Sequence, residues 1–125
     1  MSLGFFLKDK KIEQVCICEH CGLEHKSEYA RTLFHINITH NLGRMADLCG
    51  VYKCLWRPDE NGFIYAHQIT HHLKEGLDSL VAEPEKYKNF EPSNGWGTYD
   101  ILKKSIVSII QACEEYPNAQ IEVDR

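Results

Sequence analysis

Apolar and polar residues alternate over an eleven-residue stretch, 28–38, in the first third of the chain. A period of two predicts a β-strand with one buried face. The short β-branched run 12–17 predicts a strand before it, and the two strands are expected to pair as a hairpin. The residues expected on the buried side of the longer strand are Ala30, Thr32, Phe34, Ile36 and Ile38.

From Thr39 onward the apolar period becomes that of a helix. Stripes spaced by three and four residues predict helices over about 39–57, 66–80 and 99–116, with a short helical turn over 85–90. Thr98 is the expected N-cap of the third of these helices, and Asn37 or Thr39 that of the first. The alternating segment 119–123 predicts a closing strand.

These elements predict an α+β domain in the order β-β-α-α-α-β. A small antiparallel sheet of about three strands would be covered on one face by three helices. A chain of 125 residues allows one domain, 1–125, in which a hairpin over 12–38 precedes a helical layer and closing strand over 39–125.

Composition and charge exclude several classes of protein. Apolar residues make up 43% and charged residues 26% of the chain, which are ordinary globular values. The net charge of −4 disfavours binding to nucleic acid, which is expected to need a basic face. No apolar run approaches the roughly 20 residues of a membrane span. Because the short apolar stretch 3–7 lacks the order of a signal peptide, we expect a cytoplasmic protein with reduced thiols.

Three of the six cysteines are crowded into the segment VCICEHCGLEH, 15–25. Cys18 and Cys21, followed by glycine, have the spacing of a zinc knuckle, in which a tight turn aims two thiolates at one ion. The chain has no second pair with this spacing. The expected ligands of a structural Zn²⁺ are therefore Cys16, Cys18, Cys21 and His25.

Alternatives to this ligand set stay open. His20 could replace one ligand, and His67 with His71 could supply a pair, because they lie four residues apart on a predicted helix. A hairpin turn without metal is the other interpretation. Cys49 and Cys113 lie on apolar helical stripes and are expected to be buried hydrophobic residues.

Polar residues gather where the strand 28–38 leads into the first helix. Backbone N–H groups at a helix start attract anions, and side-chain donors there would add to this attraction. Capping explains Asn37 or Thr39 but not the other residues. The candidate ligand contacts of this segment are Asn37, Thr39, His40, Asn41 and Arg44.

A second group of candidate ligand contacts contains both tryptophans. Trp56 and Arg57 end the first predicted helix, and Asn94 and Trp96 lie in a glycine-containing loop. Indole and guanidinium planes can stack on a base or a sugar, and glycine lets a ligand approach the backbone. The alternative is that each tryptophan simply covers the core.

The sequence contains no complete catalytic motif. It has no phosphate-binding loop, no G-x-G-x-x-G fingerprint and no Ser/His/Asp order, and His67, His71 and His72 lack the glutamate of a zinc-protease motif. Enzyme activity is therefore uncertain, and no organic cofactor is expected.

Four segments carry a resemblance to known proteins: ITHNLG (38–43), LWRP (55–58), NGWGTYD (94–100) and IEVDR (121–125). Together they resemble a family of small proteins encoded in bacteriophages and prophages, over about residues 38–125. That family has no established activity. The resemblance implies a phage accessory protein in a bacterial cytoplasm, and the cysteine segment is not part of it.

Several functions are compatible with these observations. The first is non-catalytic binding of a small anionic or nucleotide-derived ligand, since anion-friendly and stacking groups occur without a catalytic set. The second is a protein-interaction module with a structural zinc knuckle, directed at a host or phage protein. An enzyme using His40 as general acid or base comes third.

Overall fold

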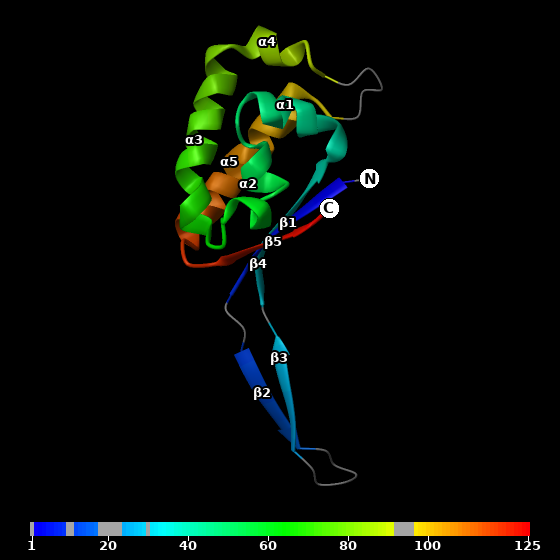
Figure 1. Cartoon of the computed structure of the whole chain (residues 1–125), viewed down its shortest axis with the longest axis vertical. Helices are drawn as coiled ribbons and strands as arrows, with labels where there is room; N and C mark the ends of the chain where they lie inside the picture. The colour runs from blue at the N-terminus through cyan, green and yellow to red at the C-terminus, as the bar shows by residue number, and fades with distance from the viewer. Residues whose placement is uncertain (1, 10–11, 18–23, 30, 92–96) are drawn as a thin grey trace.

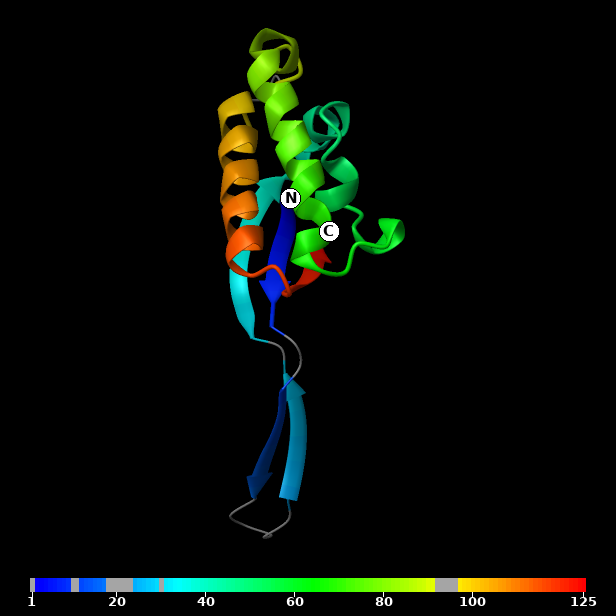
Figure 2. The ribbon, with the colours of Figure 1, turned by 90° about the vertical axis from the view of Figure 1, so that its left-hand side faces the viewer.

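A computed structural model of the chain describes residues 2–9, 12–17, 24–29, 31–91 and 97–125, with the backbone alone over 12–17 and 24–29. Within these residues the protein has an α+β fold, which confirms the predicted class. A three-stranded antiparallel sheet has the strand order β4-β1-β5, and the helices lie on one of its faces (Figures 1 and 2).

The central strand of this sheet is β1 (Ser2–Lys8), which pairs antiparallel with β4 (Thr32–Thr39) and with β5 (Gln120–Asp124). Leu3, Phe5 and Leu7 alternate along β1 and are fully buried under the helices. This strand was not predicted from the sequence, so the prediction that the sheet begins at residue 12 was wrong. Because Phe6 is also apolar, Phe5, Phe6 and Leu7 form a continuous apolar run, and the alternation typical of a strand is not visible in the sequence.

The predicted strand 28–38 is also corrected, because it is divided between β3 (Glu24–Tyr29) and β4. β2 (Ile12–Ile17) has the predicted bounds, but it pairs with β3 in a separate two-stranded sheet. Leu7 lies opposite Phe34, and Ile12 opposite Tyr29, so the same antiparallel register resumes beyond an irregularity at Lys8. β1–β4 and β2–β3 are therefore two parts of one long hairpin.

The outer part of this hairpin extends away from the rest of the molecule. In both views β2 and β3 project from the end of the sheet, clear of the helices (Figures 1 and 2). We call residues 12–29 the arm. The other described residues form the body.

The predicted helix over 39–57 is broken into shorter pieces. Gly50 has a φ of +87°, a conformation that ends a helix and is open to glycine at little cost. The longer helices over 66–80 and 99–116 are confirmed, and the hydroxyl oxygen of Thr98 accepts a hydrogen bond from the N–H of Ile101, as expected of an N-cap. The helical segments are η1 (His40–Leu42), α1 (Gly43–Leu48), α2 (Tyr52–Leu55), η2 (Asp59–Asn61), α3 (Ala66–Ala82), α4 (Pro84–Lys88) and α5 (Tyr99–Glu115).

α3 and α5 cover the sheet and enclose the core with β1. Cys49, Cys54 and Cys113 are buried there as free thiols, which confirms the expectation for Cys49 and Cys113. Burial raises the pKa of Cys49 and Cys54 to about 11 and that of Cys113 to about 12. These thiols are therefore protonated at neutral pH and serve as small hydrophobic side chains.

Two neighbouring aromatic residues test the central role of β1. Phe5 is fully buried, whereas Phe6 is half-buried on the open face, where its ring stacks on His35 at 4.3 Å between centroids. We expect Phe5→Ala to lower the free energy of unfolding by about 3–5 kcal/mol. Phe6→Ala should cost about 1 kcal/mol, because it removes mainly a stacked pair. Urea denaturation measures both changes, and equal losses would contradict the assignment of the two faces.

Candidate functional site

Residues from distant parts of the chain meet at Trp56, directly after α2. Its side chain is only 3% exposed, and its indole N–H donates a hydrogen bond to Nδ1 of His40 at 3.0 Å. Its backbone carbonyl accepts a hydrogen bond from Nη1 of Arg125 at 2.9 Å. We call His40, Trp56 and Arg125 the Trp56 junction. It joins residues of the segments 38–43, 55–58 and 121–125.

The fourth segment reaches the same neighbourhood through Gly97. This residue has a φ of +102°, and a Cβ there would lie 2.7 Å from Cγ2 of Thr39 and 2.9 Å from Cγ of Leu42. Both the conformation and the close contact require glycine. Gly97 is therefore packed against the ITHNLG segment.

The hydrogen bond from Trp56 determines the protonation pattern of His40. An indole N–H only donates, so Nδ1 of His40 must accept, and the ring proton of the neutral imidazole is on Nε2. His40 is half-buried, where the chain passes from β4 into η1. Any acid–base or ligand contact of this ring would be made through Nε2.

Arg125 holds the C-terminal end of β5 to the η2 segment as well as to Trp56. Its guanidinium donates hydrogen bonds to both carboxylate oxygens of Asp59, at 2.7 and 3.2 Å. This contact lowers the pKa of Asp59. Because the folded-state pKa lies below the unfolded value, the associated stabilisation is present above the usual carboxyl range and is lost as the pH falls through the lowered pKa.

Most of the other predicted ligand contacts have partners within the protein. The hydroxyl of Thr39 caps η1 by accepting from the N–H of Asn41, and Asn37 contacts Nε2 of His35 through its amide oxygen at 3.2 Å. The guanidinium of Arg44 lies over the ring of Phe90, 5.4 Å from its centroid.

Arg57 is also engaged. Tyr52 and then Glu60 raise its pKa, and its Nη1 donates to Oε2 of Glu60 at 2.9 Å. The ring of Tyr52 in turn stacks on Trp56. Structural roles thus account for Thr39, His40, Trp56 and Arg57, and a ligand contact by these residues stays a prediction. Asn94 and Trp96 lie outside the described residues.

The cysteine segment can be judged only by its backbone register. Cys16 in β2 and His25 in β3 are direct partners across the antiparallel ladder, one rung before the strands end. Direct partners are the closest neighbours across such a ladder. Two of the four expected zinc ligands are therefore placed next to each other, while Cys18 and Cys21 lie outside the described residues.

The alternative ligand pair is used differently. His71 is exposed and contacts Glu75 through Nε2 at 2.8 Å, while His67 stacks on Tyr65. Within the described part of the chain, no group of three or more His, Cys, Asp or Glu side chains is arranged to hold a metal ion. The ligand set on the arm stays a prediction.

Arg125 and Asp59 were not predicted as parts of the site. The two residues are 66 positions apart in the sequence, so no local spacing predicts their contact. Only the position of Arg125 within the IEVDR segment pointed to it.

Comparisons of the chain with protein-family models, with curated proteins and with solved structures found no match. Fold and site together define a small α+β protein with a projecting hairpin arm and a hydrogen-bonded tryptophan junction. Within the described residues, no helix is long and apolar enough to cross a membrane.

The hydrogen bond between Trp56 and His40 can be measured by a double-mutant cycle. Trp56→Phe keeps an aromatic ring but removes the donor, and His40→Ala removes the acceptor. We expect the two losses of unfolding free energy to be coupled by about 0.5–1.5 kcal/mol. Trp56→Phe combined with Arg44→Ala is the matched control, and a coupling as small as in that control would contradict the junction.

Proposed function

We propose that the protein is a protein-interaction module that uses the arm as its binding element. A structural Zn²⁺ would hold the end of the arm. The single observation that carries this proposal is that β2 and β3 pair with each other, as a two-stranded sheet separate from that of the body. The family resemblance implies that the partner is a host or phage protein in a bacterial cytoplasm.

The arm needs a source of stability outside its own backbone pairing. A two-stranded hairpin is at best marginally stable in water, because it has no third layer against which to bury side chains. A bound partner or a bound metal would supply that stability. The body, in contrast, has its own core around Phe5, and we expect it to fold without the arm.

The register of β2 and β3 supports a zinc ion that links the two strands. Cys16 and His25 are direct partners near the end of the β2–β3 ladder, and the sequence between them contains the C-x-x-C pair Cys18 and Cys21. Thiolate and imidazole in a set of four are typical of structural zinc sites. Such an ion would tie the two strands together at the end farthest from the body.

Binding of a small anionic ligand is less well supported by the geometry. His40 and Trp56 are hydrogen-bonded to each other, Arg57 is paired with Glu60, and Arg44 lies on Phe90. None of the four cavities described in the structure is lined by these residues.

Removing the arm tests its role as the binding element. Because the N–H of Asp9 donates to the carbonyl of Arg31 at 2.8 Å, residues 10–30 can be replaced by a two-residue Asn-Gly turn. We expect this variant to keep the thermal unfolding midpoint of the body. It should lose the stoichiometric partner that the full chain captures from bacterial lysate, as identified by mass spectrometry.

Two outcomes would contradict this proposal. One is capture of the same stoichiometric partner by the arm-deleted chain. The other is the absence of any stoichiometric partner for the full chain. Purified partner then allows the loss of affinity to be measured directly by calorimetry.

The zinc site is tested by comparing native and denatured masses of the purified protein. We expect one zinc ion per chain, and none in Cys18→Ser/Cys21→Ser, because the remaining two ligands cannot complete a tetrahedral set. His67→Ala/His71→Ala is the control and should retain the ion. A metal-free native mass would contradict the zinc site. Loss of zinc in the control would show that His67 and His71 on α3 bind the ion instead.

A further inference from the structure

The two outer edges of the body sheet differ in how they are protected. At the β5 edge, the N–H of Ile121 donates to the carbonyl of Ile64 at 2.8 Å, and Tyr65 forms a bridge with Gln120. β5 also carries Glu122 and Asp124, and charged residues discourage pairing with another chain. The β5 edge is therefore partly covered and charged.

The β4 edge has none of these features. Among the described residues β4 pairs with β1 alone, so its other side presents unpaired backbone N–H and C=O groups. Its sequence, TLFHINIT, contains no charged residue, no proline and no glycine. A long edge strand of this composition is a template for pairing with a further strand.

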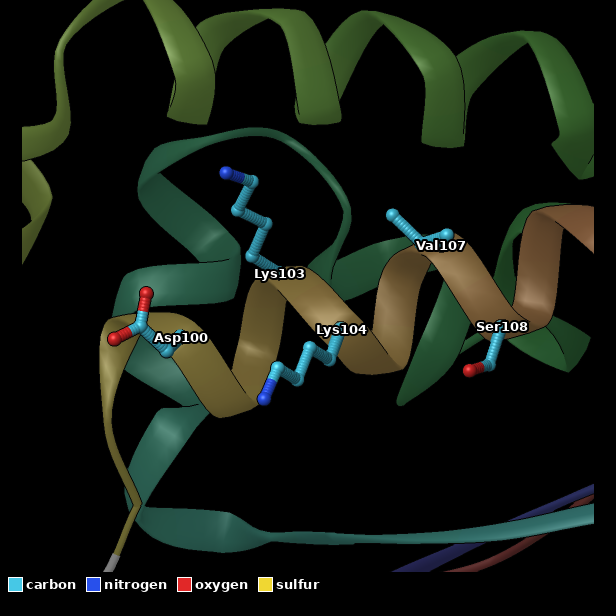
Figure 3. A pocket seen from close by; sticks show the side chains of 5 residues that line it. All are labelled: Asp100, Lys103, Lys104, Val107 and Ser108. Atoms are coloured by element: carbon cyan, nitrogen blue, oxygen red, sulfur yellow. The ribbon is translucent and has the colours of Figure 1, made fainter.

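Three cavities follow one another along α5, and two of them are also lined by residues of β4. One of about 460 Å³ is lined by residues of α5, among them Lys103, Lys104 and Ser108 (Figure 3). A second, of about 310 Å³, shares Ser108 and is lined also by Leu33 and Phe34 of β4. A third, of about 300 Å³, continues to Glu115 and the start of β4. The space beside the free edge is thus open along the second half of α5, from Ser108 to Glu115.

α5 presents a polar stripe to this space. Lys104, Ser108, Gln111 and Glu115 are spaced by four, three and four residues, which places them on one face of the helix. Figure 3 shows Lys104 and Ser108 on the side of β4, whereas Lys103 points to the side of α3. Neither Lys104 nor Glu115 forms an ion pair with any described residue.

When the α5 helices of two copies lie antiparallel, each residue of one stripe faces a complementary residue of the other. Lys104 of one copy would then face Glu115 of the other, and Ser108 would face Gln111. A cation at one end and an anion at the other make the stripe complementary to itself, as a two-fold interface requires. No other arrangement of two such stripes satisfies both charges.

We infer that the β4 edge and the Lys104–Glu115 stripe of α5 form an interface for a second copy of this chain. The two β4 strands pair antiparallel about a two-fold axis and join the sheets into one six-stranded sheet. The two α5 helices lie side by side and antiparallel on the same face of that sheet, so that Lys104 of each copy faces Glu115 of the other.

The dimensions of the two elements agree with this arrangement. The start of α5 lies near the end of β4, where Gly97 contacts Thr39, and its last turn shares a cavity with Leu33. β4 therefore runs antiparallel to α5. Seventeen helical residues and eight strand residues both span about 25 Å, so the stripe follows the whole edge.

Charge reversal on the full chain tests the interface. Sedimentation velocity over a range of concentrations should show a monomer–dimer equilibrium for the wild type. Lys104→Glu alone and Glu115→Lys alone should each weaken dimerisation by about tenfold or more, because like charges then face each other. The double variant, Lys104→Glu with Glu115→Lys, should restore it, since the exchanged charges again match.

Lys103→Glu is the matched control, because it makes the same charge change one residue away, at a side chain that points toward α3 and not toward β4. It should leave dimerisation unchanged. A wild type that stays monomeric at every concentration, a dimer insensitive to both single reversals, or a double variant that fails to recover would each overturn the inference. Far-UV circular dichroism confirms that each variant is folded, and the arm-deleted chain should dimerise like the wild type, which separates this interface from the proposed function of the arm.

Discussion

The burial of one strand, β1, is the constraint on which the rest of this structure depends. Leu3, Phe5 and Leu7 are fully removed from solvent, and β4 and β5 are joined in the sheet only through their pairing with β1. The helices cover the face that these three side chains form. Loss of this strand would leave the two remaining strands of the sheet without a common partner.

The same strand also explains the arm. β1 and β4 continue into β2 and β3 in one antiparallel register, so the arm is the extension of a hairpin whose base is anchored in the core. An anchored base limits the directions in which the arm can point, while its outer end is free to meet a partner. The Trp56 junction performs a related task at the other end of β4, where it connects η1 to α2 and to the end of the chain.

The sequence predicted the elements whose pattern is periodic and one-sided. α3 and α5 followed from their apolar stripes, the strand at Ile12–Ile17 was found with its bounds, and the alternation of 32–38 found most of β4. β1 was missed because Phe6 interrupts its alternation. The β3 segment EHKSEY carries almost no apolar residue, so no burial pattern marked it as a strand.

The site was less accessible to prediction. Spacing identified His40 and Trp56 as candidates, but it could not show that one accepts a hydrogen bond from the other across 16 residues. Thr39 was one of the two predicted caps, Asn37 being the other, because a cap depends on neighbours only. The contact between Arg125 and Asp59 forms because the fold brings two distant parts of the chain together. A local sequence pattern does not encode such a contact.

The central claim is that the body folds on its own around β1, whereas the arm depends on what it binds. Amide hydrogen exchange of the isolated, metal-free protein tests this claim most directly, because it reports local opening strand by strand. The account predicts that amides of β1 exchange at least about a hundredfold more slowly than those of β2 and β3, and that zinc slows exchange in the arm. Equal protection of the arm and β1 in the metal-free protein would contradict it.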